Sequence, residues 1–107
     1  MTVVRMWHGW TTPENADAYQ TLLCTQIIPV IEARSIPGYR SIALLRVDRG
    51  EEVEFITLMT FDSLADVVGF QGQDYRFAYV PDAARRLLKR WDVVSDHYDI
   101  VEKRAYR

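Results

Sequence analysis

The chain has 107 residues, 49% of them hydrophobic and 26% charged, which is the size and balance of one folded domain. Its net charge of −2 gives no electrostatic reason to expect nucleic acid or an anionic membrane as a partner. A single cysteine excludes an internal disulfide, and no apolar run approaches the roughly 20 residues of a membrane span. No signal peptide precedes the first strand-like pattern, so we expect one cytoplasmic domain over residues 1–107.

A strand and then a long helix are predicted for the first third of the chain. Residues 3–10 are rich in β-branched and aromatic side chains, which favours a strand. Thr12 before Pro13 has the form of a helix N-cap with proline at the first helical position. Apolar residues then recur every three or four positions as far as the stop signal Ile36-Pro37-Gly38. Pro29 lies inside this helix and should kink it or remove a hydrogen bond.

A hairpin and a second helical region are predicted next. Residues 39–48 and 51–61 are strand-like, and only Arg49-Gly50 separates them, which indicates a β-hairpin. Ser63, with Asp66 three residues later, has the pattern of a capping box and opens a helix.

The end of the chain completes the predicted order β-α-β-β-α-β. Residues 81–90 form a further helical piece, with the basic residues on its solvated side, and residues 91–103 form the fourth strand. This order is that of an α+β, ferredoxin-like fold, in which an antiparallel four-stranded sheet carries both helices on one face. Right-handed crossovers and a hairpin place the strands in the spatial order 4-1-3-2.

Both faces of the hairpin strands are largely apolar, which predicts a dimer. In residues 53–61, Val53 and Phe55 alternate with Ile56 and Leu58. A sheet with one solvent-exposed face should be apolar on its other face only. The helices cover one face, so we expect a second copy of the chain to cover the other, in a homodimer with two sheets packed about a two-fold axis.

Four stretches carry a resemblance to a known family. They are RMWHGWT at the start, IPGYRSIALLR after the first helix, VEFITLMTFDSLADVVGFQGQDY in the middle and HYDIV in the last strand. With these the chain resembles, over nearly its whole length, the small dimeric α+β-barrel proteins grouped with the antibiotic biosynthesis monooxygenases. The resemblance implies a cleft between sheet and helices in each protomer. In oxygenase members it implies oxidation of a phenolic or polyketide substrate by dioxygen without metal, flavin or haem, because the deprotonated ring supplies the electrons.

The haem-degrading branch of that family is not matched. It uses an asparagine in the first strand, and a tryptophan and a haem-ligating histidine on the second helix. Residues 3–10 contain no asparagine, and residues 63–90 contain neither tryptophan nor histidine. We therefore expect no haem. We expect no metal either, because His8 and His97 lack a third ligand at a suitable spacing.

His97 is the candidate catalytic residue, because the unperturbed pKa of about 6.5 suits a base that deprotonates a phenol. In a strand its two chain neighbours point to the opposite face, and Asp99 lies about 7 Å further along. A partner from Arg5 or Trp7 in the adjacent first strand is an equal alternative. The competing interpretation is a histidine that is hydrogen-bonded within the dimer interface.

Arg5, Trp7, Tyr75 and Arg76 are the candidate substrate-binding residues. Tyr75 and Arg76 fall in the irregular piece between the two helical parts, where binding groups are more frequent than packing groups. The first functional hypothesis is a monooxygenase-like protein that acts on a small aromatic or polyketide-like molecule with O2 and no cofactor. The alternatives are a non-catalytic ligand-binding or regulatory dimer, and a lyase or isomerase that uses the same pocket.

Overall fold

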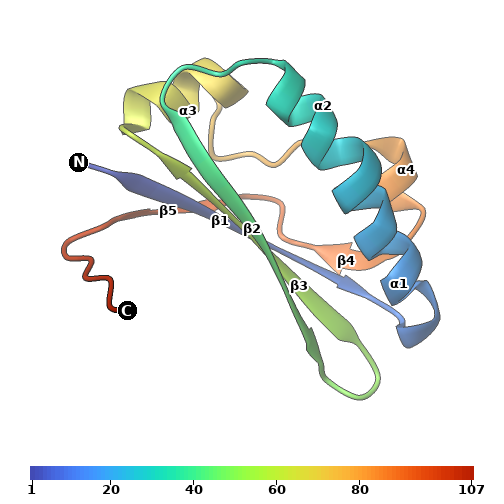
Figure 1. Cartoon of the computed structure of the whole chain (residues 1–107). Coiled ribbons are helices and arrows are strands. Elements are labelled where there is room, and N and C mark those ends of the chain that lie inside the picture. The colour runs from blue at the N-terminus through green and yellow to red at the C-terminus, as the bar shows by residue number, and fades with distance from the viewer.

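The computed structural model describes residues 1–107 and has an antiparallel sheet with all of its helices on one face (Figure 1). Strand β1 (Val3–Thr11) is central and pairs with β3 (Val53–Phe61), which in turn pairs with β2 (Tyr39–Asp48). The sheet order β2-β3-β1-β4 confirms the predicted order 4-1-3-2 and the ferredoxin-like α+β fold.

The predicted fourth strand, residues 91–103, was wrong in its extent, because it is broken into β4 (Leu88–Trp91) and β5 (Asp96–Asp99). Both pieces pair with β1, β4 near its end and β5 near its start. Between them the chain forms hydrogen bonds with another segment: Ala78 N donates to Val93 O at 2.9 Å, and Ser95 N donates to Arg76 O. This competition for backbone partners interrupts the strand.

The predicted helix over residues 81–90 was also too long. Helix α4 covers only Asp82–Arg85, and Leu88, Lys89 and Arg90 belong to β4 instead. Lys89 and Arg90 both reach Glu52 at the hairpin, at 3.4 and 3.0 Å. Pairing with the open edge of β1 and with this carboxylate therefore overrides the helical pattern of the sequence.

The long N-terminal helix contains a wide turn. It consists of α1 (Pro13–Leu22), a π-helical segment η1 (Leu23–Ile27) and α2 (Ile28–Ala33). Ile28 N donates to Leu23 O, five residues back, so one extra residue is accommodated just before Pro29. The predicted disturbance at Pro29 is confirmed, and it takes the form of this wide turn. Proline has no N–H to continue the α-helical hydrogen bonds.

The side chains between sheet and helices form two buried clusters. One surrounds Tyr19 and Phe55, whose rings meet edge to face, and the other surrounds Phe61, against which Val67 of α3 (Leu64–Gln71) packs. The predicted capping box opens α3, where Ser63 Oγ accepts from Asp66 N. The two clusters leave room for a cavity between them.

The outer face of the sheet, which no helix covers, carries the alternate residues of each strand. Strand register places apolar side chains there from three strands: Val4, Met6, Trp10, Ala43, Leu45, Val47, Ile56 and Leu58. Leu45 and Val47 are 42% and 40% exposed. None of the helices is long and apolar enough to cross a membrane.

Candidate functional site

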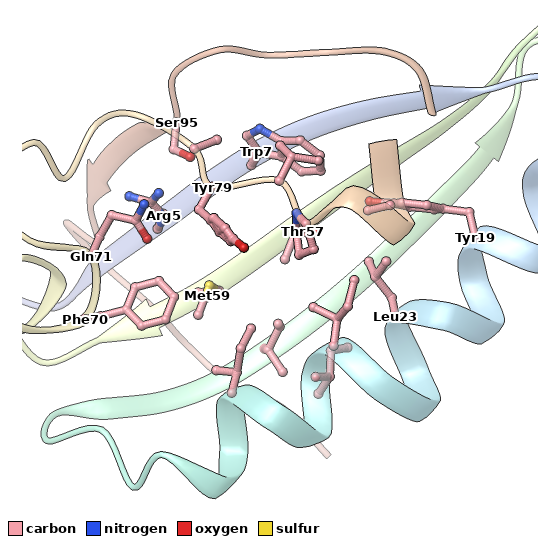
Figure 2. A pocket seen from close by; sticks show the side chains of 18 residues that line it. Arg5, Trp7, Tyr19, Leu23, Thr57, Met59, Phe70, Gln71, Tyr79 and Ser95 are labelled. Carbon is pink, nitrogen blue, oxygen red and sulfur yellow. The ribbon is translucent and has the colours of Figure 1, made fainter. Parts of the chain in front are cut away.

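A cavity of about 120 Å³ lies between the sheet and the helical rod α1-η1-α2 (Figure 2). Of its 18 lining residues, 13 are hydrophobic, which makes the cavity favourable for an apolar ligand. Dry cavities of roughly 150 Å³ accommodate one benzene ring. The cavity therefore has about the size for a single ring.

Strands of the sheet, the helical rod and the segment before α4 all contribute to the walls. The two-residue period of strands points Arg5 and Trp7 of β1, and Met59 of β3, toward the helices. The i→i+5 hydrogen bond of η1 joins Ile28 to Leu23, and both side chains line the cavity. Tyr79 also lines the cavity although it is 71% exposed, so it lies at the mouth.

Arg5 is the charged residue in this wall. It is only 5% exposed, and its guanidinium forms no ion pair with any carboxylate of the chain. Its Nη1 donates to the carbonyl of Tyr75, and its Nη2 lies 3.5 Å from the carbonyl of Phe77. Burial lowers the pKa of Arg5 to about 10, so it is still positively charged at neutral pH.

His97 lies beside Arg5, on the face of the sheet that the helices cover. The two residues are directly opposite in the β1–β5 register, and His97 Nε2 is 2.9 Å from Arg5 Nη1. A guanidinium can only donate, so Nε2 accepts and the imidazole is neutral with its proton on Nδ1. Burial, with Arg5 and Arg76 nearby, lowers the pKa of His97. His97 does not lie on the outer face, where the expected dimer interface would be.

The predicted substrate-binding residues divide between two places. Arg5 and Trp7 line the cavity, whereas Tyr75 and Arg76 line a shallow neighbouring pocket that also includes His97. The Tyr75 ring meets the His97 ring edge to face, with the centroids 5.1 Å apart. Trp7 Nε1 donates to Asp92 O at 2.7 Å, so Trp7 presents ring surface to the cavity, not a hydrogen-bond donor.

Ser95 is a cavity residue that sequence reasoning missed. It lines both the cavity and the neighbouring pocket, and it is 1% exposed. Its Oγ has no hydrogen-bond partner in the protein. A serine in a strand-like stretch gives no sign of this in the sequence, because its position depends on the break between β4 and β5.

Tyr19 was also missed as a cavity residue. The helical spacing identified it as an apolar-face residue, and the structure adds that it lines the cavity at the end away from Arg5 (Figure 2). Burial raises the pKa of its phenol. No group of three or more His, Cys, Asp or Glu side chains is placed to hold a metal ion.

Solved structures with this fold come from several bacteria. Rv0793 from Mycobacterium tuberculosis matches with a TM-score of 0.63 and 20% identity, over 98% of this chain and 100% of that one. A Bacillus cereus protein with the provisional name antibiotic biosynthesis monooxygenase matches with a TM-score of 0.67 and 9% identity, over 100% and 98%. The chain has the antibiotic biosynthesis monooxygenase-like fold.

A third structure, from Chloroflexus aurantiacus and with the same provisional name, matches this fold with a TM-score of 0.60 and 19% identity, over 98% of each chain. No protein-family model matches the sequence, and no curated protein matches it significantly. At these identities the likeness establishes the fold and not the chemistry.

Proposed function

We propose that the protein binds a small phenolic or polyketide-like ring in the cavity and oxidises it with dioxygen, without a metal, flavin or haem. The observation that carries this proposal is a ring-sized, largely apolar cavity with one buried, unpaired guanidinium in its wall. Trp7 and Phe70 form walls of the cavity and do not fill it. The provisional names of two structural neighbours agree with this choice of chemistry.

The buried charge of Arg5 supports this chemistry because it favours the ionised form of a phenol. The ring of the phenolate is electron-rich and passes its electrons to dioxygen, with formation of a carbon–oxygen bond. The released phenol proton returns to the peroxide, which loses water when the ring carbon gives up its hydrogen as a proton. The product is a quinone, so one oxygen atom enters the product, the other leaves as water, and the ring supplies all the electrons.

We assign His97 a positioning role in this reaction. A base needs a free lone pair, but Nε2 of His97 accepts from Arg5, and the lowered pKa makes the ring a weaker base. The same bond fixes the guanidinium against the cavity wall. His97 would therefore act on the substrate through Arg5, and its role as the base stays a prediction that the following experiment tests.

Oxygen uptake with a panel of phenols and quinols tests the reaction. We expect uptake with the wild-type protein and a large loss in Arg5→Met. His97→Gln keeps an acceptor for Arg5 but cannot act as a base, whereas His97→Ala removes both properties. If His97 positions Arg5, the Gln variant retains most of the activity and the Ala variant does not. Equal loss in both variants would instead identify His97 as the base.

One observation favours the alternative, a ligand-binding module without catalysis. No histidine, carboxylate or cysteine lines the cavity, so no side chain of ordinary proton-accepting type faces the ligand. This alternative predicts ring binding by calorimetry with no oxygen uptake for any member of the panel.

We also propose that the protein is a homodimer formed through the outer face of the sheet. The apolar side chains of β1, β2 and β3 on that face have no cover within the chain, and burying them against a second copy removes them from water. Two sheets packed in this way would form an α+β barrel with one cavity in each protomer.

A further inference from the structure

The Arg5 end of the cavity contains hydrogen-bond donors that the protein itself does not use. A guanidinium has five N–H groups. Two of those on Arg5 reach the Tyr75 carbonyl and His97 Nε2, and a third lies at a long 3.5 Å from the Phe77 carbonyl. The Nε–H and one N–H on Nη2 have no acceptor in the chain. Nε and Nη2 lie on the same side of the guanidinium, which is a side that can bind a carboxylate through both oxygens.

Ser95 supplies an additional donor at the same end. Its hydroxyl is buried and has no partner, which in a folded protein costs free energy that a bound acceptor would recover. Arg5, Trp7 and Ser95 all line the cavity, and Figure 2 shows Arg5 and Ser95 at the same end of it. Continuing the β1–β5 register by one step places Ser95 on the same face of the sheet as His97 and Arg5.

The charge at this end is not balanced by the protein. Arg5 has carbonyl groups, a neutral imidazole and the Phe70 ring as its neighbours, and no carboxylate pairs with it. A buried charge is costly unless it is paired, and an anion is the ligand that removes this cost. The remaining walls are mostly apolar, so they favour a ligand whose other part is a ring or another hydrocarbon group.

We propose that Arg5 and Ser95 form an oxyanion subsite, so that the ligand is a ring compound with an ionised oxygen group, a carboxylate or a phenolate. This inference rests on the proposed function of the cavity as a ring-binding site. It does not require oxidation, because a bound anion is equally compatible with the non-catalytic alternative. It adds Ser95 as a specificity-determining residue.

Anaerobic calorimetry with benzoate, benzamide and phenol tests the subsite without turnover. Benzoate is anionic at neutral pH, whereas benzamide has a similar shape and no charge. Because a hydrogen bond to a charged group is stronger than one to a neutral group, we expect benzoate to bind at least about tenfold more tightly than benzamide. Phenol that binds more tightly as the pH rises from about 7 to about 9, where Arg5 keeps its charge, identifies the phenolate as the source of the oxyanion. Benzoate binding identifies the carboxylate. Benzamide binding as tightly as benzoate, together with phenol binding that does not change with pH, would overturn the subsite.

The variants Ser95→Ala and Thr11→Val separate the contribution of a hydroxyl to ligand binding from its contribution to the packing of the protein. Thr11 Oγ1 is also buried and without a partner, but Thr11 does not line the cavity. Removal of either hydroxyl should leave stability unchanged or slightly higher, because no hydrogen bond is lost. We expect only Ser95→Ala to weaken benzoate binding, by roughly tenfold. Equal affinity in both variants would overturn the role of Ser95.

The variants of Arg5 test the charge itself. Arg5→Lys keeps the positive charge without the fork, and Arg5→Met removes the charge. We expect Arg5→Met to lose the preference for benzoate over benzamide and Arg5→Lys to keep part of it. Circular dichroism verifies folding, and if Arg5→Met does not fold, Ser95→Ala with its control still decides the question. A preference for benzoate that survives in folded Arg5→Met would overturn the assignment.

Discussion

At the scale of single residues, the contact between Arg5 and His97 links the cavity to solvent pH. His97 accepts from Arg5 only while its ring is neutral. Burial, with Arg5 and Arg76 nearby, lowers the pKa of His97, so the folded protein takes up this proton less readily than the unfolded chain does. Protonation would place two cations against each other and disturb the donor that faces the ligand.

Protein stability should therefore decline in weak acid, in part through His97. The contribution of His97 to the free energy of unfolding is fully present above the pKa of the residue in the unfolded chain, about 6.5. It is lost as the pH falls through the lower pKa of His97 in the folded state. His97→Gln keeps the acceptor and cannot titrate, so it should lose less stability than the wild type between about pH 7.5 and pH 5.5. Urea unfolding at the two pH values measures this, and an identical decline in both proteins would contradict it.

At the scale of elements, the three long strands follow from the sequence, whereas the fourth does not. Alternating apolar residues and the Arg49-Gly50 turn were enough to place β2 and β3. The break between β4 and β5 depends on backbone hydrogen bonds between residues 93–95 and 76–78, which the local sequence pattern cannot reveal.

Prediction of the site from the sequence has the same limit. Arg5 and His97 were individually identified, but their contact joins residues 92 positions apart, and the unpartnered hydroxyl of Ser95 follows from the break.

The start of β2 depends on a glycine with a left-handed backbone. Gly38 has φ +76°, and a Cβ there would lie 2.2 Å from the Asp66 carboxyl group, which accepts a hydrogen bond from the Ser63 hydroxyl at the start of α3. Gly38→Ala should therefore lower the free energy of unfolding by about 2–3 kcal/mol, through backbone strain and displacement of Asp66.

Gly50→Ala is the matched control for Gly38→Ala. Gly50 has φ +92°, but a Cβ added there would have nothing within 4 Å, so this variant should lose only the strain, about 1–2 kcal/mol. The difference between the two variants in the free energy of unfolding, measured by chemical denaturation, gives the cost of the contact with Asp66. Equal losses would show that this contact contributes nothing.

At the scale of the whole molecule, the sheet is covered on one side only. The helices bury Phe55 and Phe61 completely, whereas Leu45 and Val47 on the opposite face stay about two-fifths exposed. A row of such residues across β1, β2 and β3 exposes more apolar surface than scattered single residues do. The proposed homodimer accounts for this surface.

A charge on the outer face should dissociate the dimer. Leu45→Glu places a carboxylate in the proposed interface, and Leu64→Glu is its matched control, because Leu64 is 41% exposed on α3 and far from that face. We expect Leu45→Glu to sediment as a folded monomer, and the wild type and Leu64→Glu as dimers. A monomeric wild-type protein in dilute solution would refute the dimer.

The wide turn of η1 has a consequence for how the chamber could change. The turn contains one extra residue, and the consecutive side chains Ile27 and Ile28 both line the cavity, along with Leu23 and Ile31. Deleting Ile27 would restore a regular α-helix, with Leu23 and Ile28 then four residues apart on one face, and would leave the chamber larger by one side chain. The shape of the chamber is thus set by chain length at one turn as much as by the identity of its side chains.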